Sequence, residues 1–264
     1  MCRLLSNEER CKYQNSQLMD VVCQLRFPTI LSITASEPAK FQDAIRMEYP
    51  RYAAQKERPA PKVTGLGTDH PTLEQQPPVT NFCFVSDNGK WRVNLTNRFI
   101  ALSTQDYRGW EDFAARLDRI LAAFISCYQP FYFERIGLRY INAFSRENLG
   151  LADVPWSELI EPPYLGVLAE EDVPEQAVAK SAMDVEMALP HGCRLKLHAG
   201  PGMLRRNGQA EKQTRFIFDM DLSMTGQMTG VQIAGALSTL HSNSTSVFRG
   251  AISPRLHEAM EPQE

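Results

Sequence analysis

The segment that most constrains the fold is residues 110–144, where an amphipathic helix runs into an unusually long strand. Apolar side chains recur at helical spacing through its first part, which predicts a helix with one buried face. These side chains are Trp110, Phe113, Leu117, Leu121 and Phe124. Pro130 closes the helix, and the aromatic and β-branched residues of 131–144 favour a strand. Elements this apolar are not stable alone, so both require a sheet to pack against.

The composition is that of an ordinary soluble protein. Of its 264 residues, 43% are hydrophobic and 22% are charged, and the net charge of −3 gives no sign of a basic surface over the whole molecule. No apolar run is long enough for a membrane span, and residues 1–20 lack the apolar core of a secretory signal. Six scattered cysteines argue against a disulfide framework and a thiolate metal site, so we expect a cytoplasmic protein.

Two groups of three strands are expected, each followed by a helix. The first occupies residues 82–86, 91–96 and 99–102, with Asn88-Gly89 as a strong hairpin signal. The second occupies residues 183–189, 193–198 and 216–222, and its helix covers residues 231–248. This order predicts an α+β fold with antiparallel sheets, built from two three-strand meanders with a long helix packed on one face of each.

The register of one hairpin follows from its turn. Residues 190–192 are Pro-His-Gly, which places proline and glycine where a three-residue turn needs them. Both apolar faces then fall on one side of the sheet, and a slip of one residue would destroy this arrangement. The predicted cross-strand pairs are Leu189 with Cys193, Glu186 with Lys196 and Asp184 with His198.

The predicted organisation is one compact domain with two sheet-plus-helix units. The units cover residues 20–146 and 178–264, after a polar lead-in of residues 1–19. Residues 147–177 form a proline-punctuated connection. Residues 50–80 contain six prolines among polar residues, which predicts an exposed excursion without a packed core.

The most distinctive candidate site lies on the strand that contains Arg135, Gly137, Arg139 and Asn142. Strand alternation places both arginines and the glycine on one face, where paired guanidinium groups are suited to a carboxylate or a phosphate. The favoured alternative is structural: each arginine pairs with an acid on a neighbouring strand, and Gly137 allows a helix to approach.

Two further candidates rest on charged residues of the second meander. Asp219, Asp221 and His198, together with Asp184, are weak candidates for an oxygen-rich metal site, although cross-strand ion pairs are the simpler interpretation. We therefore expect no metal and no cofactor. Arg205 and Arg206 lie in an expected basic loop, which also contains Lys212, and are candidates for phosphate contacts.

Nucleophilic catalysis has little support in the sequence. Four of the cysteines, Cys23, Cys83, Cys127 and Cys193, occupy apparent core positions, where cysteine acts as a small hydrophobe. His241 lies on an apolar helix stripe and is expected to be a core histidine rather than a base. No serine elbow, phosphate-binding loop or His-Glu-x-x-His motif is present.

The chain resembles a sporadically distributed prokaryotic protein family of unknown function and about this length. The resemblance rests on residues 135–142, on Trp110 and Phe113 and on the strand at residues 22–27. It extends to the closing helix pattern of Leu240-His241, Phe248 and Ile252-Ser253. The resemblance implies a bacterial cytosolic protein with no mechanism to transfer, and the patchy distribution suits an accessory of a mobile or defence locus.

The leading functional hypothesis is a non-catalytic binding protein that engages a partner protein or peptide through its sheet face, its sheet edges or the proline-rich excursion. The first alternative is a hydrolase or nucleotide-acting enzyme that uses Arg135 and Arg139 with Asp219 and Asp221. The second is a nucleic-acid accessory protein that grips phosphates with Arg205 and Arg206.

Overall fold

A computed structural model describes residues 4–8, 10–58, 62–64, 72–75, 78–206 and 209–263. Its centre is one nine-stranded sheet in the order β10-β11-β12-β9-β2-β8-β7-β6-β3, in which every neighbouring pair is antiparallel. These strands are β2 (Leu18–Arg26), β3 (Arg51–Glu57), β6 (Val79–Val85), β7 (Trp91–Leu95), β8 (Phe99–Thr104), β9 (Phe133–Phe144), β10 (Met183–Ala188), β11 (Arg194–Arg206) and β12 (Gln209–Met228). The α+β class and the antiparallel sheet predicted from the sequence are confirmed.

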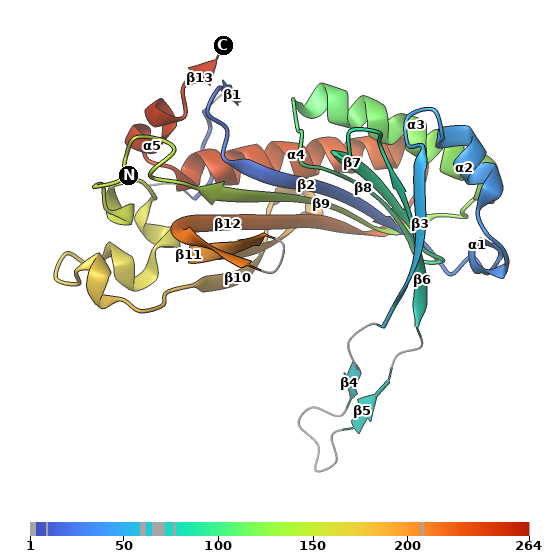
Figure 1. The fold of residues 1–264 in the computed structure, drawn as a ribbon, viewed down its shortest axis with the longest axis horizontal. Coiled ribbons are helices and arrows are strands. Elements are labelled where there is room, and N and C mark those ends of the chain that lie inside the picture. Colours follow the sequence, from blue (N-terminus) through green and yellow to red (C-terminus); the bar gives the residue numbers. More distant parts are fainter. Residues whose placement is uncertain are drawn as a thin grey trace.

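The helices lie on one face of this sheet (Figure 1). They are α1 (Ser32–Ala35), α2 (Ala39–Ile45), α3 (Trp110–Tyr128), α4 (Val231–Ala251) and α5 (Pro254–Ala259). The apolar stripe predicted for α3 is buried. The centroid of its Phe124 ring lies 4.8 Å from the ring centroid of Phe27, which directly follows β2. α4 packs over β9 and β12. No helix in the described ranges combines the length and the apolar character needed to cross a membrane.

Strand β9 runs through the interior of the sheet, between β12 and β2. Ile136, Leu138 and Tyr140 face the helices and are buried, whereas Arg135 and Arg139 point to the opposite, open face. The two meanders flank β9 and β2, so both expected units contribute strands to a single sheet. Their apolar side chains merge into one core.

The hairpin of β10 and β11 has the predicted register. Glu186 lies opposite Lys196 and Asp184 lies opposite His198, and the Leu189 amide donates to the Cys193 carbonyl at 2.8 Å. The intervening turn is a short 3₁₀ segment, η5 (Pro190–Gly192). His191 and Gly192 both have positive φ, 60° and 73°, so two residues rather than one absorb the left-handed geometry.

Two loops expected from the sequence are partly or wholly strands in the structure. Residues 51–57 of the proline-rich excursion form β3, the edge strand of the main sheet, and β4 (Lys62–Thr64) and β5 (Thr72–Glu74) form a small hairpin that projects from the body (Figure 1). The described residues of the expected basic loop after Gly200 belong to strands, up to Arg206 in β11 and from Gln209 in β12. Although the sequence there is polar, the backbone N–H and C=O groups find hydrogen-bond partners through the pairing of β11 with β12.

The lead-in and the connecting segment are also packed against the body. β1 (Lys12–Tyr13) pairs with β13 (Pro262–Gln263), which ties the chain before β2 to the chain after α5. The connecting segment contains four 3₁₀ turns, η1 (Trp156–Glu158), η2 (Pro162–Tyr164), η3 (Gly166–Ala169) and η4 (Glu175–Ala177). Trp156 and Tyr164 are buried against Phe216 and Phe218 of β12.

Candidate functional site

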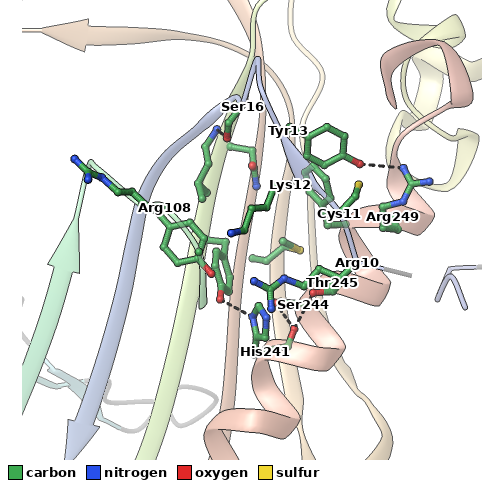
Figure 2. A pocket seen from close by; sticks show the side chains of 17 residues that line it. Arg10, Cys11, Lys12, Tyr13, Ser16, Arg108, His241, Ser244, Thr245 and Arg249 are labelled. Atoms are coloured by element: carbon green, nitrogen blue, oxygen red, sulfur yellow. Dashed lines mark hydrogen bonds between the residues drawn. The ribbon is translucent and has the colours of Figure 1, made fainter. Parts of the chain in front are cut away.

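A cavity of about 170 Å³ opens where the lead-in crosses the end of the sheet beside α4 (Figure 2). The sheet supplies its floor, α4 supplies one wall and the turn before α3 supplies another. The residues that line it are Arg10, Cys11, Lys12, Tyr13, Ser16, Leu18, Tyr107, Arg108, Gly109, Tyr140, Asn142, Met220, His241, Ser244, Thr245, Phe248 and Arg249. Five segments that are distant in the sequence therefore build one site.

The imidazole of His241 is held in one orientation at the base of this cavity. Its Nδ1 lies 2.9 Å from the hydroxyl of Tyr140, and its ring stacks on Trp110 with a centroid distance of 4.4 Å and an interplanar angle of 7°. Its other nitrogen, Nε2, is buried and has no hydrogen-bond partner among the described residues. A buried polar atom without a partner is costly, and a ligand group offers one way to satisfy it.

Burial sets the charge of this histidine. It lowers the pKa of His241 to about 4, and the positive charge of Arg10 acts in the same direction. Burial also raises the pKa of Tyr140, and the neighbouring hydroxyl of Tyr107 adds to the shift. Both groups are thus neutral at pH 7. When Tyr140 donates to Nδ1, the proton of His241 is on Nε2, and Nε2 is then a free donor.

The lining of the cavity is cationic. It includes Arg10, Lys12, Arg108 and Arg249, and none of the described residues that line it is an aspartate or a glutamate. Three acids just outside the lining pair with its arginines: Glu111 with Arg10, Asp106 with Arg108 and Glu8 with Arg249. Arg10 reaches out to Glu111 at 3.2 Å, an exposed pair of the kind that contributes little to stability. The end of the Lys12 side chain lies beside Gly109, and its ammonium interacts electrostatically with the nearby carboxylate of Glu111. Figure 2 shows Lys12, Arg10 and His241 gathered at the same cavity.

Arg249 is the most buried of these cations, and its side chain is only 10% exposed. It forms an ion pair with Glu8, donates to the Tyr13 hydroxyl at 3.1 Å and lies 2.7 Å from Nδ1 of His257. Arg249 therefore secures the lead-in to α4 and α5. This network positions Arg10 and Lys12 over the cavity.

Aromatic and sulfur-containing side chains form the remaining walls. Tyr13 packs edge-on against Phe248 at 6.0 Å, and Tyr107 packs edge-on against Tyr140 at 5.9 Å. Met220 of β12 completes the apolar surface. An apolar pocket with a few convergent polar groups is the usual form of a small-ligand site.

The arginines predicted as ligand-binding residues lie on the other face of the sheet. Arg135 donates to Asp221 at 3.0 Å, and Arg139 donates to Asp219 at 2.7 Å. Each arginine pairs with an acid on β12, which is the structural alternative that the sequence favoured. Gly137 does not admit a helix: a Cβ there would lie 2.3 Å from the Arg135 guanidinium, so the glycine makes room for that side chain.

The weak metal candidates are divided between separate ion pairs. Asp219 and Asp221 accept from the two arginines, and His198 lies 2.9 Å from Asp184 on the neighbouring strand. Within the described ranges, no group of three or more His, Cys, Asp or Glu side chains is arranged to hold a metal ion.

The other predicted site residues have different outcomes. Asn142 faces the helices, lines the cavity and donates to the Phe218 carbonyl at 3.4 Å. Arg205 and Arg206 belong to β11, and their side chains, like that of Lys212, lie outside what the structure describes.

Sequence reasoning missed the lead-in residues and treated His241 as core. The polar run 242–246 that follows His241 on α4 was the available signal that this helix face is not wholly apolar.

A second hollow of about 650 Å³ lies at the opposite end of the strands, around Arg26, Arg58, Arg98, Glu57 and Glu134. It is larger, but its charges are mixed and no described buried donor or acceptor in it lacks a partner. The smaller cavity is therefore the better candidate site.

A scan against protein-family models and a search of curated proteins both found no match to this chain.

Proposed function

We propose that this protein is a non-catalytic binding module that captures a carboxylate-bearing segment of a partner peptide or protein in the cavity between the lead-in and α4. The observation that carries the proposal is the lining that the structure describes: four cationic side chains with no carboxylate among the described lining residues, and Nε2 of His241, which has no described hydrogen-bond partner. A cationic site of this kind attracts an anion, and a buried donor within it gives that anion a specific position.

The apolar walls support a carboxylate attached to an apolar group. Tyr13, Phe248 and Met220 offer surface for a hydrophobic side chain, while Lys12 and Arg10 lie at the cavity for the charge. The free C-terminus of a peptide combines these two properties in its last residue, and capture of a terminal carboxylate is a recurrent mode of peptide recognition.

The contacts within the cavity support binding rather than catalysis. Cys11 contributes a thiol to the lining, and its proximity adds to the effect of burial in raising the pKa of Tyr13. His241 is held by Tyr140 and Trp110, and burial keeps it neutral. The enzyme alternative loses support because Arg135, Arg139, Asp219 and Asp221 neutralise one another on the open face.

The test uses a library of short random peptides with free C-termini and the same library with amidated C-termini, each presented to the purified protein. We expect micromolar binding of acid-ended peptides with an apolar last residue, and binding of their amidated forms that is about ten-fold or more weaker. Lys12→Ala weakens binding by a similar factor. Lys196→Ala is the matched control, because Lys196 is an exposed lysine on the open face of the sheet.

Two results would contradict the proposal. One is equal affinity for acid and amide ends of the selected peptides. The other is unchanged affinity in both Lys12→Ala and His241→Phe, since these variants alter the two groups assigned to the carboxylate. Circular dichroism of each variant confirms that the fold persists.

A further inference from the structure

The outer edge of strand β3 lies outside the proposed peptide site. All seven of its residues, Arg51–Glu57, are exposed, and the strand pairs with β6 over its full length without a register shift. β3 ends the order of the main sheet, so no strand in the described part of the chain pairs with its outer side (Figure 1). A regular, unpaired edge is a template for another strand.

The usual protections of an edge strand are largely missing from β3. Its sequence, RYAAQKE, contains no proline and its ladder has no bulge, and Lys56 is the one lysine it carries. Two apolar side chains remain exposed beside or near the edge: Tyr52 is 39% exposed, and Met47, four residues before the strand, is 92% exposed. A partner strand would cover surface that the single chain leaves in water.

We propose that two copies of this chain associate through antiparallel pairing of β3 with β3 about a two-fold axis at Ala54. In this register Arg51 lies opposite the partner's Glu57, and symmetry repeats this pair at the other end of the ladder. Tyr52 lies opposite the partner's Lys56, and the small residues Ala53 and Ala54 occupy the centre. The edge is thus complementary to itself, as a two-fold interface requires.

Side-chain direction supports this register. Arg51 and Glu57 are an even number of positions apart, so both point to the same face of the sheet and meet their counterparts directly. Moving the axis by one residue along the strand shortens the ladder, and neither Arg51 nor Glu57 then lies opposite a charge of the other sign. The present partner of Arg51 is Asp87, in a pair whose side chains are 62% and 90% exposed, so little stability is lost when Arg51 turns to a new partner.

The other edge of the sheet lacks this complementarity. On β10, a two-fold axis at Val185 places Asp184 opposite the partner's Glu186, and an axis at Glu186 places Glu186 opposite the partner's Glu186; these two registers give the longest ladders. Acids opposed across a ladder repel each other. The charges of β3 therefore favour a closed pair of molecules, and those of β10 disfavour extension into a longer array.

The experiment is sedimentation velocity of the full chain over about two decades of micromolar concentration, because one pair of short strands makes a small interface of modest affinity. We expect a monomer–dimer equilibrium. Arg51→Glu and Glu57→Arg each place like charges opposite each other and weaken dimerisation about ten-fold or more. The double variant R51E/E57R restores the opposite charges, and with them the dimer.

Glu170→Arg provides the control for net charge, because Glu170 is an exposed acid of the connecting segment. It leaves the dimer unchanged. A wild-type chain that stays monomeric at the highest concentration overturns the proposal, and so does a dimer that persists unchanged in both single variants. A double variant that fails to recover dimerisation while its circular dichroism spectrum is native also overturns the assigned register.

Discussion

The hydroxyl of Tyr140 lies 2.9 Å from Nδ1 of His241, and this contact joins the middle of the sheet to α4 across 101 residues of sequence. Trp110, the first residue of α3, stacks on the ring of His241. Three elements thus meet at one imidazole at the base of the cavity. The histidine is neutral there because burial opposes its protonation.

This relationship predicts a loss of stability in mild acid. The pKa of His241 is lowered to about 4 in the folded chain, whereas an unfolded histidine titrates near 6.5. Between these values the unfolded chain binds the extra proton, so the free energy of unfolding falls as pH decreases through this window. We expect the His241 contribution to fall by about 2 kcal/mol between pH 7.5 and 5. Urea unfolding at the two pH values measures it.

The control for this prediction is His241→Gln, which removes the titrating group and flattens that part of the pH dependence. A proton-detected titration that places the pKa of His241 near 6.5 would contradict the explanation.

Gly137→Ala is expected to destabilise the fold through Arg135. The added methyl group would lie 2.3 Å from the guanidinium, so the flexible end of Arg135 must move away from Asp221. We expect a cost of about 1 kcal/mol in the free energy of unfolding, since a partly buried charged hydrogen bond is lost. The cost shrinks in an Asp221→Asn background, because the ion pair is already broken. Equal costs in both backgrounds would show that the alanine acts by another route.

The Arg139–Asp219 pair is expected to couple measurably in a double-mutant cycle with Arg139→Met and Asp219→Asn. The Asp219 side chain is 16% exposed and that of Arg139 is 48% exposed, so water screens part of the attraction. We expect a coupling free energy of about 1 kcal/mol from chemical denaturation, decreasing in high salt. The exposed pair Arg108–Asp106 serves as a comparison and should show little coupling.

Tyr13→Phe is expected to loosen the lead-in over the cavity. The Tyr13 hydroxyl lies 2.8 Å from Nδ1 of His257 and accepts from Arg249, so its removal leaves these groups with one partner fewer. Hydrogen exchange should be faster at the amide of Gln14, which donates to the Glu261 carbonyl. We expect the free energy of the opening that exposes this amide to fall by about 1 kcal/mol. Tyr132→Phe, outside this network, leaves the rate unchanged.

Local pattern predicted much of the sheet. The α3 stripe, both meanders and the β10–β11 register followed from periodicity and turn chemistry, because these depend on neighbours along the chain. The pairing of Arg135 and Arg139 with acids was the favoured interpretation, and the structure identifies those acids as Asp221 and Asp219. Strand β3 was missed because its seven residues are all exposed and carry no apolar alternation.

The candidate site was much less predictable. Asn142 was named, yet its partners in the cavity come from the lead-in, from the turn at Tyr107 and from α4. His241 has the sequence pattern of a core residue, and its unpartnered Nε2 is visible only in three dimensions.

The sequence by itself determined the strands of the two meanders, the long strand β9 and the long helices, and which face of each is apolar, since periodicity is a property of consecutive residues. Only the tertiary structure decided that the two meanders share one sheet, that the lead-in closes over α4 and that four cations meet at one cavity. Such groupings join residues that are distant in the chain, and the free energy that brings them together comes from burying the common core rather than from any local pattern.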